Sequence, residues 1–213
     1  FIAIAGKPEA AALHEKALFN AMLCLSRQGK VEPLVALYGQ FAKRFPQSLL
    51  RETAIAEQGR IESLLGNESK ARARWQQILD AFPDSPRRHV LLFEVAKSLM
   101  REGKYEEALD QLEDLVSRYP NGSHIAEAHF LKLSCRRQLG ADSPDASIAA
   151  LKDLLQKFPD APVAGDILFR IGEAYFTSED FANAQTWFTR LARNAQKHDL
   201  ADDALYFAGL AAL

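Results

Sequence analysis

Apolar residues recur along this chain of 213 residues at the spacing of α-helices. One representative stretch places its apolar side chains on a single helical face, at Leu91, Leu92, Val95, Ala96 and Leu99. Followed through the chain, the pattern predicts eleven helices and no strand, near residues 8–27, 31–44, 48–65, 68–81, 86–101, 104–118, 123–139, 144–157, 162–177, 180–195 and 199 to the end.

Two turn signals separate these helices, and both repeat. An aromatic residue followed by proline begins at Phe45, Phe82, Tyr119 and Phe158, with separations of 37, 37 and 39 residues. Glycine closes the other predicted helices at positions 29, 66, 103 and 140, always 37 residues apart. A fixed period of this length is typical of a solenoid, in which each unit is a helix, a glycine turn, a second helix and an aromatic-proline turn.

Polar residues after each aromatic-proline pair predict how the next helix begins. Ser48, Ser85 and Ser123 are expected to accept hydrogen bonds from its first amides. Pro86 and Pro162 suit its first turn, and the prolines of the pairs stop the preceding helices.

These features resemble the tetratricopeptide repeat family. Small residues stand where the two helices of a unit must approach closely, at Gly59, Ala96 and Gly172 in first helices and at Ala71, Ala108 and Ala184 in second helices. A large side chain follows the latter by four residues, at Trp75, Leu112 and Phe188. The long unit and its Phe-Pro-x-Ser phrase are similar to bacterial cell-envelope members, namely outer-membrane-assembly lipoproteins and the periplasmic partner of the Tol-Pal system.

The resemblance implies an all-α, right-handed superhelical solenoid of antiparallel helix pairs, with about five and a half units. Their expected bounds are 8–46, 47–83, 84–120, 121–159, 160–196 and a partial unit at 197–213, together one repeat domain. Because the chain begins at Phe1 without methionine and stops at Leu213 within a predicted helix, we expect a fragment or a processed chain, from which any signal peptide or lipid anchor has been removed.

The family also implies a concave groove lined by first helices. Transferring its pattern gives a candidate partner-binding groove formed by Lys16, Phe19, Arg27, Arg60, Phe93, Lys97, Arg101, Phe169, Glu173, Phe176 and Tyr206. Its first half is basic, which favours acidic or carboxylate-bearing partners. Phe19, Phe93, Phe169 and Tyr206 take one place in their units, so they form either an edge of the core or an apolar ladder for a partner.

Cys24 and Cys135 lie 111 residues apart, three periods of the repeat. Equivalent positions three units apart are too distant for a disulfide, which needs Cα atoms within about 7 Å. We expect two small buried hydrophobic residues, with a reactive or intermolecular thiol as the alternative.

No enzyme is indicated by the remaining chemistry. The five histidines form no His-Glu-x-x-His motif and the sequence has no Gly-x-Ser-x-Gly elbow, so we expect neither catalytic residues nor a metal or cofactor. A net charge of −2 gives no field that attracts nucleic acid. No stretch approaches 18 consecutive apolar residues, so no membrane insertion is expected.

The sequence therefore favours a non-enzymatic scaffold that binds a protein or peptide, periplasmic or associated with the outer membrane. The alternatives are a helical repeat region of a larger enzyme, for example one that processes cell wall, and a cytoplasmic adaptor of the same family.

Overall fold

The computed structural model describes residues 11–194 and 198–212. Within them the chain forms eleven helices and no strand: α1 Ala11–Arg27, α2 Val31–Arg44, α3 Arg51–Leu64, α4 Glu68–Ala81, α5 Arg88–Arg101, α6 Tyr105–Arg118, α7 Ile125–Gln138, α8 Pro144–Lys157, α9 Ala164–Thr177, α10 Phe181–Asn194 and α11 Ala201–Leu210. The predicted helices are confirmed with bounds that shift by three residues or fewer, apart from residues 8–10, 195 and 213, which lie outside the described residues.

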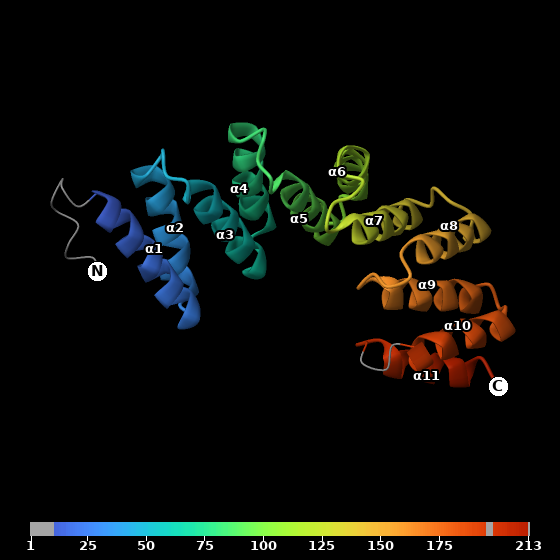
Figure 1. The fold of residues 1–213 in the computed structure, drawn as a ribbon. Helices are drawn as coiled ribbons and strands as arrows, with labels where there is room; N and C mark the ends of the chain where they lie inside the picture. Colours follow the sequence, from blue (N-terminus) through green and yellow to red (C-terminus); the bar gives the residue numbers. More distant parts are fainter. Residues whose placement is uncertain (1–10, 195–197, 213) are drawn as a thin grey trace. The chain divides into compact units, whose positions relative to one another are not determined.

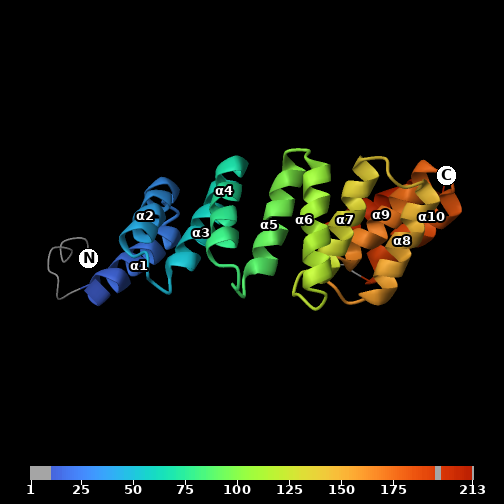
Figure 2. The ribbon, with the colours of Figure 1, turned by 90° about the horizontal axis from the view of Figure 1, so that it is seen from above.

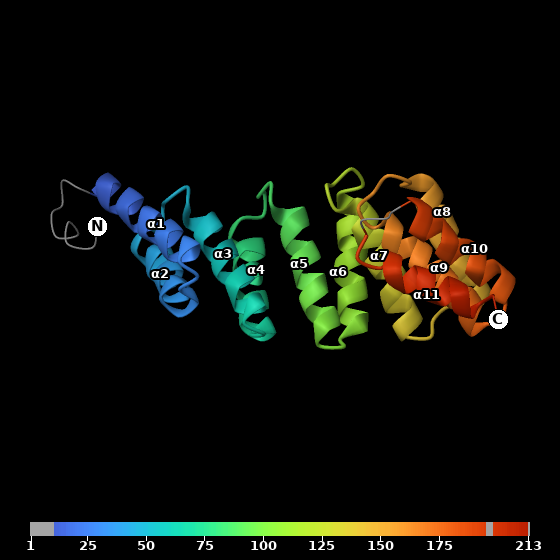
Figure 3. The same cartoon turned by 90° about the horizontal axis from the view of Figure 1, so that it is seen from below.

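The helices group into two compact units, residues 1–102 and 103–213. In the first unit, each of α1 to α4 packs against the next helix in the chain, so that the series ends at α5 (Figures 1 and 2). In the second unit, α6 to α11 do the same, and α9, α10 and α11 lie side by side (Figure 3). Consecutive helices joined by short turns form antiparallel hairpins, so the all-α solenoid class is confirmed. The expectation of one continuous domain stays a prediction.

The glycine turns have the backbone conformation that the sequence predicts. Gly66 has φ of +78°, its N–H donates to the Ser63 carbonyl, and the Asn67 N–H donates to the Glu62 carbonyl. This pair of bonds is the Schellman ending, which needs a left-handed residue. The φ angles of the other three predicted turn glycines, positions 29, 103 and 140, are also positive. Between α9 and α10 the same place is taken by Glu179, with φ of 60°.

The aromatic-proline turns also end helices as predicted. Phe82 caps α4 with φ of −130° and ψ of 70°, and its N–H donates to the Ile78 carbonyl at 2.8 Å. Proline clashes with a helical residue before it, which explains why Phe82 leaves the helix. Phe45, Tyr119 and Phe158 cap their helices in the same way.

The predicted helix starts after these turns are wrong by two or three residues. The Ser48 hydroxyl accepts from the Leu50 N–H, but α3 begins at Arg51 and its cap residue is Leu50. Ser85 likewise accepts from the Arg87 N–H, one residue before α5. A separate turn, closed by the Arg51 N–H on the Ser48 carbonyl, comes before the helix.

The same shift affects the remaining predicted helix starts. His124, not Ser123, is the cap residue of α7. Pro86 and Pro162 lie ahead of α5 and α9 rather than in their first turns.

Each of the two serines also links neighbouring repeats, because its hydroxyl donates to a carboxylate on the first helix of the preceding repeat. Ser48 donates to Glu15 at 2.7 Å and Ser85 donates to Glu52 at 2.6 Å. Both pairs are 33 residues apart, so the serine of the Phe-Pro-x-Ser phrase links consecutive repeats. The helix starts later because a separate turn precedes it, and the serine of that turn is also held by a neighbouring helix.

Each of the two compact units has its own apolar core. Met22, Phe41 and Ile61 belong to the core of the first unit, and Leu154, Ile171 and Phe188 belong to that of the second. Trp75, Leu112 and Phe188, the large residues predicted to fill the repeat, are at most 1% exposed. No helix in the described part of the chain is both long and apolar enough to span a membrane.

Candidate functional site

A groove of about 550 Å³ lies in the first unit between α3 and α5, with Trp75 of α4 contributing to it. We call it the α3–α5 groove; it is lined by Ala56, Glu57, Arg60, Ser63, Leu64, Trp75, Arg87, Val90, Leu91, Glu94, Lys97 and Arg101. On each helix the lining positions are separated mainly by three or four residues, which places them on one helical face. Three predicted site residues, Arg60, Lys97 and Arg101, are therefore brought together here.

The groove is formally positive, because four basic and two acidic side chains line it. Arg60 Nε lies 2.8 Å from Glu57 Oε2, and Lys97 Nζ lies 3.2 Å from Glu94 Oε1. Each pair belongs to one helix and is substantially exposed, so its contribution to stability is small. Carboxylates from outside the molecule can therefore compete for these cations.

The sequence interpretation missed Glu57, Glu94 and Arg87. A signal for the two glutamates was present, because each stands three residues before a base and the two acid-base pairs are 37 residues apart. No comparable signal marks Arg87, which comes from the turn before α5.

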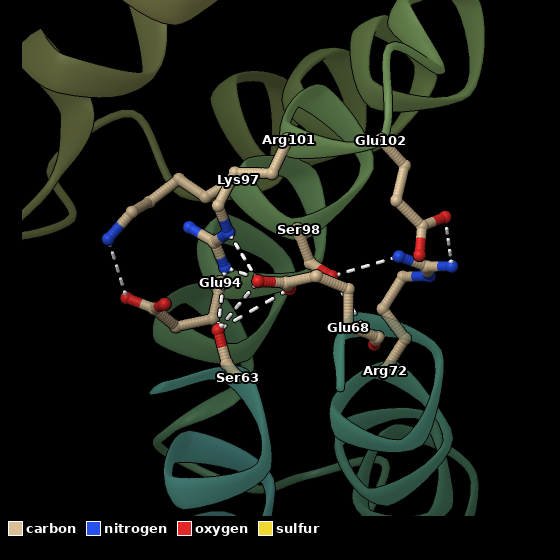
Figure 4. A network of polar contacts seen from close by, with 8 residues as sticks. All are labelled: Ser63, Glu68, Arg72, Glu94, Lys97, Ser98, Arg101 and Glu102. Atoms are coloured by element: carbon tan, nitrogen blue, oxygen red, sulfur yellow. Dashed lines mark hydrogen bonds and ion pairs between the residues drawn. The ribbon is translucent and has the colours of Figure 1, made fainter. Parts of the chain in front are cut away.

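Arg101 has a different role from Arg60 and Lys97, because it joins three helices. Its guanidinium donates to Glu68 at 2.6 and 3.0 Å and to the Ser63 hydroxyl at 2.8 Å (Figure 4). Glu68 opens α4, Ser63 is near the end of α3, and Arg101 ends α5. Arg101 therefore contributes to the packing of α3, α4 and α5 as well as to the charge of the groove.

Beside this contact, Arg72 of α4 donates to Ser98 at 2.9 Å and to Glu102 at 2.7 Å (Figure 4). Burial by itself would raise the pKa of Glu68, but the hydrogen bonds from Arg101 and Ser63 and the Arg101 charge together lower it. Glu68 is thus held as a carboxylate in contact with Arg101 and Ser63, two residues that line the groove.

The four aromatic residues in equivalent places differ in exposure. Phe93 and Phe169 are both 7% exposed, and the Phe169 ring packs edge-on against Phe188 at 5.4 Å. Phe19 is half-buried with its ring 6.2 Å from Phe41, whereas Tyr206 is 65% exposed. The burial of Phe93 and Phe169 agrees with the first of the two interpretations of these four residues, namely that they form an edge of the core.

Two other predicted residues meet in the second unit. Glu173 and Phe176 line a pocket of about 350 Å³ together with Arg137 and Phe207. Arg170 donates to Glu173 at 2.5 Å, and Arg137 lies 4.0 Å from the same carboxylate. Lys16 and Arg27 lie exposed on α1 and line neither this pocket nor the α3–α5 groove.

Both cysteines are free thiols, but only one is buried. Cys135 is fully buried, and burial raises the pKa of its thiol to about 11. Cys24 is exposed, so the expectation of two buried hydrophobic residues is wrong for Cys24. Among the described residues, no three His, Cys, Asp or Glu side chains gather in a way that would hold a metal ion.

Comparison with known proteins places the repeat in a family. Two family models of the tetratricopeptide repeat match, one at residues 126–213 and the other at 16–48, 57–85 and 91–122. Outer membrane protein assembly factor BamD of Caulobacter vibrioides is 24% identical over 136 residues, which cover 57% of this chain and 45% of that protein. The chain thus spans less than half the length of this curated relative.

Solved structures with the same fold are more distant in sequence. MamA from Desulfovibrio magneticus RS-1 is 17% identical with a TM-score of 0.67, covering 87% of this chain and 97% of that one. The apo form of RapI is 15% identical with a TM-score of 0.74, covering 91% and 74%. YrrB, described as a TPR protein with an unusual peptide-binding site, is 18% identical with a TM-score of 0.62, covering 95% and 100%. Since the two family models together match most of its residues, the chain belongs to the tetratricopeptide repeat family.

Proposed function

We propose that this chain is a non-enzymatic scaffold that binds a peptide or protein segment along the α3–α5 groove. Tetratricopeptide repeats are in general protein-interaction modules, which supports the class of function. The observation that carries the assignment to this groove is its composition, a formally positive rim over apolar Val90 and Leu91. Apolar anchors flanked by charged side chains are the usual arrangement of a binding surface.

The partner segment carries carboxylates in this proposal. Arg60 and Lys97 are 37 residues apart, so they stand at equivalent places on neighbouring first helices. An extended or helical segment that crosses α3 and α5 meets both cations. Their present partners, Glu57 and Glu94, lie on the same helices and are partly exposed, so an incoming carboxylate replaces a weak ion pair with a comparable one.

The proposed setting is a bacterial cell-envelope assembly, periplasmic or associated with the outer membrane. The similarity to an outer membrane protein assembly factor supports this setting. Because the matched region covers 45% of that protein, the activity of the whole relative does not transfer with it.

A photo-crosslinking amino acid at position 64 tests the proposal. Leu64 is 74% exposed and lines the α3–α5 groove, whereas Ala73 is exposed on α4 and does not line it. We expect Leu64 substituted in this way to crosslink a discrete polypeptide from the envelope fraction of the source organism, and the matched variant at Ala73 not to do so. Equal crosslinking from both positions would contradict the assignment to the groove, and a partner found solely in the cytoplasmic fraction would contradict the proposed setting.

A further inference from the structure

A separate cavity of about 340 Å³ lies in the second unit between α7 and α8. His129, Lys132 and Arg136 of α7 line it together with Asp153, Leu154 and Lys157 of α8. None of these residues lines the α3–α5 groove, so this α7–α8 cavity is a distinct feature of the chain. Its volume is within the range of pockets that hold small ligands.

Three cations converge on this cavity from two helices, and their existing contacts leave room for a ligand. Lys132 Nζ lies 3.1 Å from Glu113 Oε1 of α6, a carboxylate whose side chain is 52% exposed. Such an exposed pair is weak and exchanges readily for another anion. The Lys157 ammonium lies 5.3 Å from the centroid of its neighbour Phe158, and no acidic partner is described for it.

Arg136 is held by a fork of hydrogen bonds to Asp142, in which Nε lies 2.7 Å from Oδ2. This pair fixes the guanidinium at the cavity edge. The acidic groups around the cavity are therefore Glu113, Asp142 and Asp153, of which Asp142 is committed to Arg136 and Asp153 is exposed. Lys132 and Lys157 are therefore the cations of the cavity that are not held by a fork of two hydrogen bonds to a carboxylate.

His129 reports the electrostatic balance inside the cavity. Burial lowers the pKa of His129, and the charges of Lys157 and Lys132 lower it further. The positive charges of both lysines therefore act on the imidazole. At neutral pH the ring is uncharged and offers one N–H donor to a ligand.

We propose that the α7–α8 cavity binds a phosphate group, held between Lys132 of α7 and Lys157 of α8 with His129 as a hydrogen-bond donor. A phosphate carries several strong acceptor oxygens, so it bridges cations on two helices at once, which a single carboxylate does less well. The phosphate belongs either to a soluble compound or to a lipid headgroup, since the contacts are the same.

Inorganic phosphate is the first probe, with the full chain and the His129 ring resonance followed by NMR. We expect a saturable shift and an increase in the pKa of His129, because a bound anion favours the imidazolium. Lys132→Gln combined with Lys157→Gln should weaken binding at least tenfold. Lys70→Gln, an exposed lysine of α4 outside the cavity, should bind like the wild type. Circular dichroism confirms that each variant is folded.

Vesicles separate the two sources of phosphate. Co-sedimentation with phosphatidylglycerol vesicles, lost in the double variant and absent with phosphatidylcholine, would identify a lipid headgroup. Saturable binding of inorganic phosphate without vesicle recruitment would identify a soluble phosphate compound. The proposal is overturned if the folded wild type shows no saturable shift of His129, or if the double variant and the wild type bind phosphate equally.

Discussion

Gly59 of α3 lies directly against the Trp75 ring of α4, so closely that a Cβ atom on Gly59 would stand 2.5 Å from Trp75 Nε1. The indole N–H also points to the Ala56 carbonyl at 3.4 Å. The same relationship joins Gly172 to Phe188, where the added atom would stand 2.7 Å from the ring. A glycine and a ring thus set the separation of the two helices in two of the repeats.

Gly59→Ala should therefore lower the free energy of unfolding by about 1–3 kcal/mol, because the methyl group overpacks a filled site. Trp75→Ala should lower it by about 3–5 kcal/mol, because the ring is 1% exposed. Urea denaturation followed by circular dichroism measures both. Gly209→Ala is the matched control: its Cβ meets nothing within 4 Å, so helix propensity alone should raise stability by up to about 1 kcal/mol. Loss of stability in the control equal to that in Gly59→Ala would disprove the contact.

Glu179→Gly should stabilise the second unit by about 0.5–1 kcal/mol. Glu179 has φ of 60°, a left-handed conformation that costs an ordinary residue about 1–2 kcal/mol, and glycine relieves part of this at an entropic cost. Gly66→Ala should instead lower stability, because it places a side chain on a residue with φ of +78°. Thermal denaturation of the two variants checks the pair, and a lower midpoint for Glu179→Gly would show that its backbone is not strained.

Glu68→Gln should cost about 1 kcal/mol at neutral pH, by weakening the bonds from Arg101 and Ser63. The pKa of Glu68 is lowered in the folded chain from its ordinary value of 4.5. Its stabilising effect is therefore complete above pH 4.5 and is lost as the pH falls through the lower, folded-state pKa. Denaturation midpoints of wild type and variant from pH 7 to pH 3 should converge on the acidic side. A difference between the two midpoints that stays constant with pH would contradict the proposed stabilisation by the bonds of Glu68 to Arg101 and Ser63.

The two thiols should react very differently in the folded chain. Cys24 is exposed, whereas burial raises the pKa of Cys135 to about 11 and covers its sulfur. A maleimide at pH 7 should label Cys24 alone, and both residues should be labelled in denaturant. Rapid labelling of Cys135 without denaturant, in a Cys24→Ser variant, would show that α7 is not packed as described.

Local signals in the sequence predicted most of the fold. Gly66 and its equivalents marked turns that need positive φ, and Phe82 with Pro83 marked a helix end, so these boundaries were confirmed. The predicted start of α3 was wrong because a separate turn at Ser48 precedes the helix, and the Ser48 hydroxyl bonds to Glu15, 33 residues away. A contact at that separation is invisible to a local capping rule.

The repeat period likewise predicted which residues take equivalent positions, but it did not predict how exposed their side chains are. Cys24 and Cys135 stand three periods apart, yet α7 packs against both α6 and α8, whereas α1 packs against α2. Equivalent residues of a repeat thus differ in burial with the number of neighbouring helices. Phe93 and Tyr206 differ in exposure despite their equivalent places.

The repeat positions of Arg60, Lys97 and Arg101 predicted that they share one groove, and all three line it. The sequence did not predict that their contacts differ. Arg60 and Lys97 pair within their own helices, whereas Arg101 bonds to Glu68 and Ser63 across 33 and 38 residues. Reversing the charge of Arg101 would therefore damage the fold and the groove together. A test of binding should leave Arg101 in place.

The affinity of the Arg60→Glu, Lys97→Glu double variant for the segment captured by crosslinking tests the central claim most directly. Titration calorimetry at physiological salt should show binding at least tenfold weaker than wild type, with an unchanged denaturation midpoint. Lys43→Glu with Lys70→Glu, two exposed lysines outside the groove, makes the same change in net charge and should bind like wild type. Equal affinity of wild type and the groove variant would contradict the assignment of the binding site to the α3–α5 groove.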